Sequence, residues 1–177
     1  MKIANFLNKF SKDDSLNHIV QKLCESAITI TKGIHNDDYE IEQTTKNIDG
    51  DTQKPLDIFS DRTLLNSLKI KDVAAYCSEE QEGLVSINED GKFVVVTDPL
   101  DGSSNIEANV SIGTIFSIFP TNGLKVQEAI FQQGNKQACS GFFVYGPRTT
   151  FFLTFKKGTH SFFLNYNSNQ FELLQKD

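Results

Sequence analysis

The chain has 177 residues, of which 38% are hydrophobic and 23% are charged, and its formal net charge is −6. This length and composition are ordinary for a soluble globular protein with one hydrophobic core. The negative charge, without a dense Lys/Arg stripe or a long apolar run, argues against nucleic-acid binding, a membrane-spanning segment and a secretory signal peptide.

Helical periodicity marks the first third of the chain. Apolar side chains recur at helical spacing between polar ones, and acidic and Ser residues just before them can cap the start, so we expect an amphipathic helix over residues 15–34. Residues 35–55 are acidic, Asn-rich and rich in turn-forming residues, which predicts a mostly irregular stretch. A second helix is expected over residues 57–69, just after Pro55.

The rest of the chain is typical of short strands joined by turns. Strands are predicted at residues 73–77, 84–87, 93–97, 111–119, 149–155, 160–166 and 171–174, with a short helix at 126–132. This order favours an α+β fold, in which helices are layered on a mostly antiparallel sheet. Neither a repeat nor a low-complexity linker divides the chain, so residues 1–177 are expected to form a single domain.

The cysteines indicate a reducing compartment. Cys24, Cys77 and Cys139 are odd in number, widely spaced and outside any Cys-x-x-Cys pair. They fit reduced thiols better than disulfides or zinc ligands, and three scattered histidines do not favour a His-based metal site. We therefore expect a cytoplasmic protein.

The most informative segment is VVVTDPLDGSSN at residues 94–105. A buried apolar strand would run directly into two carboxylates, and Pro99 would fix the turn between them. Asp98, the Leu100 carbonyl and Asp101 can then converge on one point. These are hard oxygen ligands, the type that Mg²⁺ prefers.

The residues that follow could hold a phosphate. Gly102 lets the backbone come close to a ligand, and consecutive N–H groups at Gly102, Ser103 and Ser104 can form an anion-binding nest. Asp-Pro or Asp-Gly alone more often marks a surface turn than a site. Both dipeptides, fused into one strand–turn unit and followed by Ser-Ser-Asn, favour a site.

Other carboxylates could join this segment. Glu79 and Glu80 follow the expected strand at 73–77, and Asp51 and Asp57 lie near the start of the second expected helix. Each has a plainer interpretation, because a Glu pair is usually a solvated turn and Asp57 would stabilise the helix dipole. All of these plainer interpretations must hold together if the protein is not an enzyme.

On these residues the chain resembles the class I fructose-1,6-bisphosphatases. The resemblance rests on DPLDGSSN at residues 98–105 followed by VSIGTIF at 110–116, whereas the wider lithium-sensitive phosphatase superfamily shares only Asp-Pro-x-Asp-Gly. It extends to GD at 50–51, LD at 56–57, SEE at 78–80, QGNKQ at 133–137 and GFFVYG at 141–146. The likeness covers the chain from about residue 15 to its end.

The resemblance implies a role for each candidate residue. Magnesium ions, with Mn²⁺ as an alternative, would be bound by Glu79, Asp98, the Leu100 carbonyl and Asp101. The phosphate at carbon 1 would be held by Asp101, Gly102, Ser103 and Ser104. Asp57 and Glu80 would orient and deprotonate the attacking water, and Asp51 would lie on a dynamic loop that closes over the site.

The implied activity is hydrolysis of the 1-phosphate of fructose 1,6-bisphosphate to fructose 6-phosphate in gluconeogenesis. The partner would be a small sugar bisphosphate, and complete chains would form a homo-oligomer, a tetramer by resemblance. Sedoheptulose-1,7-bisphosphatase activity is an alternative within the family. A non-catalytic metal-binding module descended from the family, and a plain α+β interaction domain with coincidental acidic turns, are alternatives of other classes.

The chain departs from the family in two respects. Family members continue for roughly as long again, with a domain that supplies a further metal-binding glutamate and the sugar-binding residues. We therefore expect a fragment with little or no activity alone and an apolar face for the missing domain. The family's nucleotide loop is not found, and its lysine–tyrosine pair and arginine fall on Lys92, Phe93 and Pro120, which predicts weak or absent AMP inhibition.

Overall fold

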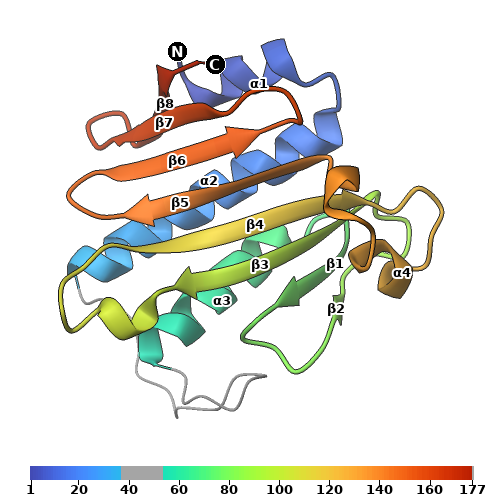
Figure 1. Ribbon diagram of the computed structural model, residues 1–177, viewed down its shortest axis with the longest axis horizontal. Coiled ribbons are helices and arrows are strands. Elements are labelled where there is room, and N and C mark those ends of the chain that lie inside the picture. Colours follow the sequence, from blue (N-terminus) through green and yellow to red (C-terminus); the bar gives the residue numbers. More distant parts are fainter. Residues whose placement is uncertain (37–53, 177) are drawn as a thin grey trace.

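The computed structural model describes residues 1–36 and 54–176 and contains one eight-stranded sheet (Figure 1). The strands are β1 (Val73–Ser78), β2 (Val85–Ser86), β3 (Phe93–Asp101), β4 (Ile112–Pro120), β5 (Cys139–Tyr145), β6 (Thr149–Thr154), β7 (His160–Asn165) and β8 (Gln170–Gln175). Their order in the sheet is β2-β1-β3-β4-β5-β6-β7-β8. Among the described strands only β1 and β3 pair in parallel, so the predicted α+β fold with a mostly antiparallel sheet is confirmed.

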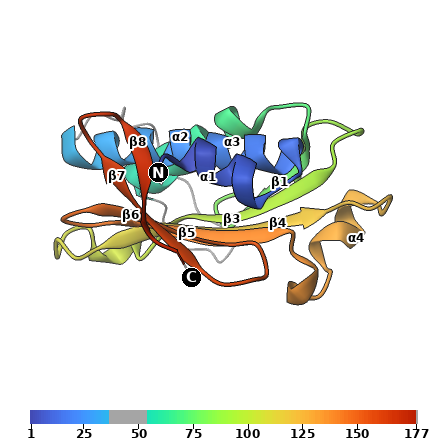
Figure 2. The same cartoon turned by 90° about the horizontal axis from the view of Figure 1, so that it is seen from above.

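Three helices cover one face of the sheet, as Figure 2 shows: α1 (Ile3–Phe10), α2 (Asp14–Asn36) and α3 (Pro55–Leu68). Among the described residues the opposite face carries only α4 (Val126–Ile130), which packs at one end against β3 and β4. The sheet therefore has one covered face and one largely open face.

The long helix α2 forms as its apolar periodicity predicts. Its buried stripe includes Leu16, Ile19, Leu23 and Ile30, which face the sheet. Asp13 caps the start, because its Oδ1 accepts hydrogen bonds from the backbone N–H groups of Ser15 and Leu16 at 3.0 and 3.1 Å. The strong amphipathic pattern thus fixes which face of the helix meets the core.

The second half of the sheet is an antiparallel meander with a core of stacked aromatic rings. In β6 and β7, buried and half-buried residues alternate, as expected where one sheet face is covered. Phe151 lies at the centre, with its ring centroid 4.3 Å from Phe143, 5.6 Å from Phe162 and 5.7 Å from Phe171. The many Phe residues of this region are therefore packing residues.

The structure corrects the sequence-based elements at three places. Helix α1 was not predicted, and it forms because Ile3, Phe6 and Leu7 pack on the meander. Strand β5 was not predicted either, although Cys139 and Phe143 already alternate with outward residues. Strand β3 runs to Asp101, beyond the expected 93–97, because β4 continues to pair with it past the acidic residues.

The other expected elements agree within a few residues at their ends. None of the described helices is both long and apolar enough to cross a bilayer. Cys24, Cys77 and Cys139 are free thiols, and burial raises the pKa of the Cys24 thiol well above its ordinary value. The expected irregular stretch at 35–55 falls mostly outside the described residues.

Candidate active site

Two carboxylates meet where the parallel strands β1 and β3 end. Ser78 is paired with Thr97, so Glu79 and Asp98 each come one residue after this pair. The Glu79 N–H donates to the Thr97 carbonyl at 3.2 Å. Because the carboxyl ends of parallel strands lie at the same sheet edge, both side chains reach one place, the type of position where open sheets bind ligands.

A β-bulge shapes the acidic segment of β3. Asp98 lies opposite Ile115 and Asp101 opposite Gly113, so β3 has one residue more than β4 over this step. The Thr114 hydroxyl on β4 holds the bulge by donating to the Pro99 carbonyl at 2.8 Å. Bulges bend a strand and redirect its side chains, so this one sets the directions of the two aspartates.

Glu79 and Asp98 interact strongly. Burial, the nearby charge of Glu79 and a hydrogen bond shared with Glu79 raise the pKa of Asp98 to about 7, while the Leu100 N–H opposes this shift. That N–H donates to Asp98 Oδ1 at 3.1 Å. Two carboxyl groups at such short range repel each other when both are ionised, and a cation between them would remove the repulsion.

Asp57 lies at the start of α3, beside Ser103 of the segment 102–104, which is the candidate phosphate loop. Its Oδ2 accepts the Lys54 backbone N–H at 2.7 Å, whereas its Oδ1 is buried with no hydrogen-bond partner among the described residues. Burial raises the pKa of Asp57, and the negative charge of Glu79 adds to this, while the Lys54 N–H, the Ser103 side chain and the Lys54 charge oppose it. Asp57 is 3% exposed, so its unpartnered oxygen marks a place for a donor or a cation.

The Gly-Ser-Ser segment turns sharply against the start of α3. Gly102 has φ +80°, in the left-handed region where glycine is favoured, and the 3₁₀ turn Ser103–Asn105 follows it. The Lys54 ammonium donates to the Ser103 carbonyl at 3.1 Å. This contact joins the candidate phosphate loop to the element that carries Asp57.

The structure thus brings some candidate residues together but does not gather all of them into one ligand set. Glu79 contacts Asp98, and Asp57 lies within electrostatic range of Glu79 and beside Ser103. Within residues 1–36 and 54–176, no three His, Cys, Asp or Glu side chains are arranged to hold one metal ion. The carboxylates therefore gather in pairs rather than as a closed ligand set, and Asp51 lies outside the described residues.

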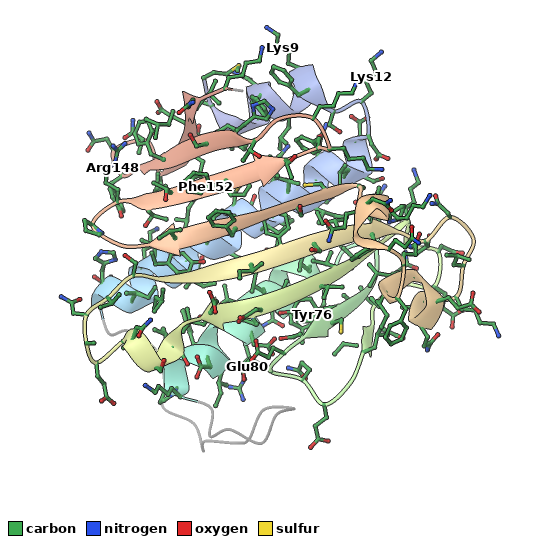
Figure 3. All side chains as sticks on the ribbon, viewed as in Figure 1. Lys9, Lys12, Tyr76, Glu80, Arg148 and Phe152 are labelled. Atoms are coloured by element: carbon green, nitrogen blue, oxygen red, sulfur yellow. The ribbon has the colours of Figure 1, made fainter. Side chains whose placement is uncertain are left out.

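The remaining candidates line the same region. Leu100 is buried, and Asp101 and Ser104 are exposed beside it. The Glu80 N–H donates to Ser78 Oγ at 3.1 Å, and Figure 3 shows the Glu80 side chain on the β1 side of the molecule. These residues lie on the same turn and loop as the interacting carboxylates.

The donor set fits a hard divalent cation. The groups nearest one another are carboxylates, with a backbone carbonyl between the two aspartates of β3, and these oxygens suit Mg²⁺ or Mn²⁺. The buried, unpartnered Asp57 Oδ1 and the close approach of Asp98 to Glu79 are the features that a bound cation would compensate. The residues therefore fit such an ion.

Two contributors to the site were missed from the sequence. Lys54 connects the phosphate loop to Asp57, and Thr114 holds the bulge. Lys54 gives no local signal, because its role depends on a contact 49 residues away along the chain. Thr114 could have been noticed as a hydroxyl at the inward position between Ile112 and Phe116, where it needs a partner.

Comparison with known proteins gives a consistent result. The family model described as "Fructose-1-6-bisphosphatase, N-terminal domain" matches residues 3–176. "Fructose-1,6-bisphosphatase class 1" of Rhizobium meliloti is 42% identical over 151 residues, which are 81% of this chain and 43% of that protein. The protein of the same name from Neisseria meningitidis serogroup A is 42% identical over 134 residues, 75% of this chain and 41% of that protein.

A solved structure shares the fold. The crystal structure of Leishmania major fructose-1,6-bisphosphatase in holo form aligns with a TM-score of 0.88 at 27% identity, over 99% of this chain and 58% of that one. The chain thus spans less than half the length of the curated relatives that it matches.

Proposed function

Because the chain belongs to the fructose-1,6-bisphosphatase family, we propose that it forms the metal- and phosphate-binding part of an enzyme that hydrolyses the 1-phosphate of fructose 1,6-bisphosphate. The observation that carries this proposal is the contact of Glu79 with Asp98, with Asp57 of a third element within electrostatic range of Glu79. Side chains that repel one another when ionised are brought close together only at a cost in stability, which a bound cation offsets.

Glu79, Asp98, the Leu100 carbonyl and Asp101 would hold Mg²⁺, with Mn²⁺ as an alternative. When bound, two or three such ions neutralise the phosphate dianion, lower the pKa of a bound water and stabilise the leaving alkoxide. The bulge at Asp98–Asp101 supports this assignment, since the two aspartates lie opposite Ile115 and Gly113, two residues apart on β4, and therefore project from the same face of the sheet.

Asp57 and Glu80 would orient the attacking water and remove its proton. A raised pKa suits a general base near neutral pH, and one oxygen of the Asp57 carboxylate has no partner within residues 1–36 and 54–176. Asp51 would act on a loop that closes over the site. Asp101, Gly102, Ser103 and Ser104 would hold the 1-phosphate, and the left-handed Gly102 supports this because it turns successive N–H groups toward one side.

We further propose a cytoplasmic, gluconeogenic role and a homotetramer for the complete enzyme. This chain by itself is expected to release little or no phosphate from fructose 1,6-bisphosphate, since it spans only 43% of the Rhizobium enzyme. Phosphate release by the purified chain at a rate ordinary for enzymes, roughly 1–10³ per second, would contradict this.

Experiments can distinguish the proposed activity from two alternatives. A sedoheptulose-1,7-bisphosphatase would use the same metal and phosphate residues, and assays of the complete enzyme with both sugars distinguish the two activities. A non-catalytic metal-binding module would bind the cation without phosphate release in any complete form. The retention of Asp57, Glu79, Glu80, Asp98 and Asp101 favours an enzyme, because a module without catalysis would not need a water-activating pair.

Calorimetric titration of this chain with Mg²⁺ tests the proposal. The wild-type chain is expected to bind the ion, and Asp98→Asn is expected to weaken binding by about a hundredfold, since it removes a ligand and not just its support. Asp90→Asn is the matched control, because it removes the same charge at an exposed turn before β3. If the wild-type chain and both variants bind Mg²⁺ equally, the proposed site is wrong.

AMP is expected to inhibit the complete enzyme weakly or not at all. The Asp13 carboxylate already accepts the N–H groups of Ser15 and Leu16 at the start of α2, so this helix end presents a negative charge to a phosphate. Inhibition by micromolar AMP in a phosphate-release assay would contradict this expectation.

A further inference from the structure

A chain of buried hydroxyl groups runs beneath the candidate site. The Thr97 hydroxyl donates to the Tyr76 hydroxyl at 2.9 Å, and the Tyr76 hydroxyl donates to Asp61 Oδ1 at 2.9 Å. The Gln81 side-chain amide donates to the other oxygen, Asp61 Oδ2. Thr97, Tyr76 and Asp61 are all buried, and both carboxyl oxygens of Asp61 are therefore hydrogen-bonded.

Each member of this network is close in sequence to a residue of the candidate site. Thr97 directly precedes Asp98 on β3, and Asp61 follows Asp57 by one helical turn on α3. In the sequence, Tyr76 on β1 precedes the pair Glu79–Glu80 and Gln81 follows it. The network thus joins the three elements that carry the proposed metal ligands and water-activating residues.

The loop after β1 is also held by hydrogen bonds of its backbone N–H groups. The Glu79 N–H donates to Thr97 O, the Glu80 N–H to Ser78 Oγ, and the Gln81 N–H to Ser78 O. The first of these bonds depends on where Thr97 lies, and the other two are local. The contact of Gln81 with Asp61 is therefore a direct link from this loop to α3.

Tyr76 is suited to act as the central donor. It is fully buried in β1, between Ala75 and Cys77, so its hydroxyl needs a partner inside the protein. Burial, and then the nearby Asp61, raise the pKa of Tyr76 well above its ordinary value, which keeps the phenol protonated. Buried networks of this type hold their members in one arrangement, because a broken bond leaves a polar group without water.

We propose that Asp61, Tyr76, Thr97 and Gln81 are positioning residues, which hold the loop Ser78–Gln81 against α3 and β3 so that Glu79, Asp98 and Asp57 approach one another. The placement of the loop rests on the geometry alone, and its consequence for cation binding rests on the proposed function. None of the four residues is assigned as a ligand or as a catalytic residue.

The test compares Tyr76→Phe with Thr149→Val. Tyr76→Phe removes only the central hydroxyl. Thr149→Val is the matched control, because it removes another buried hydroxyl, bonded to Thr31 at 3.2 Å, on strand β6, which carries no candidate site residue. The readouts are amide hydrogen exchange of residues 78–82 and the Mg²⁺ dissociation constant from calorimetry.

Tyr76→Phe is expected to speed exchange in residues 78–82 at least about tenfold relative to Thr149→Val, after correction for global stability. It is expected to raise the Mg²⁺ dissociation constant about tenfold, the lower end of the effect of residues that support metal ligands. Asp61→Asn keeps a carbonyl oxygen for the Tyr76 hydroxyl, so it should retain more protection of residues 78–82 than Asp61→Ala.

The two claims fail in different ways. Equal exchange of residues 78–82 in Tyr76→Phe and Thr149→Val would overturn the positioning role, whatever the Mg²⁺ affinity. Faster exchange with unchanged Mg²⁺ affinity would also overturn it, because the loop would then not set the ligand positions. A wild-type chain that binds no Mg²⁺, together with the exchange contrast, would instead overturn the proposed function and leave the structural role of the network supported.

Discussion

Two parts of the molecule share one sheet but bury different kinds of side chain. One part is β1 and β3 with the helix α3, and the other is the meander β5–β8. The meander packs through aromatic rings centred on Phe151. In the other region the interior contains Asp57 and Asp61, and among the described residues two of the three buried polar atoms without partners, Asp57 Oδ1 and Ser60 Oγ, belong to α3. One region is built for packing and the other contains groups that lower stability.

The difference between the two regions indicates where the functional site lies, independently of any comparison with related proteins. Unpartnered buried oxygens and carboxylates with raised pKa values lower stability, and proteins retain such groups mainly where they have a task. Here they gather around the end of β3, whereas Phe151 and its neighbours serve the fold alone. Substitutions in the two regions should therefore separate stability from cation binding.

The largest expected effect is on the stability of the meander. Phe151→Ala should lower the free energy of unfolding by about 3–5 kcal/mol, because it opens a cavity between three aromatic rings. Urea denaturation measures the loss. Phe152→Ala, its half-buried neighbour on the open sheet face, is the control and should cost much less. If folded Phe151→Ala bound Mg²⁺ with a changed affinity, packing in the meander and cation binding would not be independent.

The open face of the meander is expected to promote self-association. Figure 3 shows Phe152 on this face, and the exposed Phe142 stacks on it with centroids 4.7 Å apart. Ile115, which is 44% exposed, lies directly opposite Phe142 on the neighbouring strand. Replacing Phe142 and Ile115 together by Thr should weaken self-association about tenfold, or about 1.4 kcal/mol, in sedimentation velocity. A wild-type chain that is monomeric at high concentration would contradict this.

A smaller effect, of opposite sign, is expected at the acidic site. Without divalent ions, Asp98→Asn should stabilise the chain by about 1 kcal/mol at pH 8, a value reduced for solvent screening of this partly exposed carboxyl. The pKa of Asp98 is raised from 3.8 to about 7, so the folded state binds more protons and the penalty grows as pH rises between these values. The gain should be complete above about pH 7 and absent below about pH 4. Urea denaturation at pH 8 and at about pH 4 measures it, and equal stabilisation at both would contradict the raised pKa of Asp98, which burial and then the charge of Glu79 cause.

The smallest expected effect concerns a carboxylate that has a basic partner. Burial raises the pKa of Asp72, but hydrogen bonds from His18 and Ser15 outweigh it, so this pKa lies below its usual range. His18 Nδ1 lies 2.7 Å from Asp72 Oδ2. Asp72→Asn should lower stability by about 0.5 kcal/mol at neutral pH, and the loss should vanish as pH falls through the pKa of folded Asp72. If Asp72→Asn stabilised the chain, as is expected of Asp98→Asn, the expected difference in sign between the two carboxylates would be wrong.

The sequence was most informative where a feature depends on neighbouring residues. The periodicity of α2 and the strand leading into Asp98 are local patterns, and both elements were predicted. The parallel pairing of β1 with β3 is not local, because the paired residues lie 19 or 20 positions apart, and it decides that Glu79 lies beside Asp98. The bulge at Pro99 was missed for the same reason, since it exists only relative to Gly113 and Ile115 of β4.

The missed elements follow the same rule. Helix α1 is only eight residues long, too short to be stable without its contacts to the meander, so local propensity did not reveal it. The buried network was missed because its members lie up to 36 residues apart, from Asp61 to Thr97. Tyr76 carried a signal, because a tyrosine within an apolar strand needs a partner for its hydroxyl.

The most direct test of the central claim is a crystal structure of this chain grown with Mn²⁺, with anomalous diffraction used to locate the ion. We expect an anomalous peak within about 2.0–2.5 Å of carboxylate oxygens of both Glu79 and Asp98. Ordered side chains of Glu79 and Asp98 with no peak between them, at a Mn²⁺ concentration that saturates binding in solution, would contradict the account.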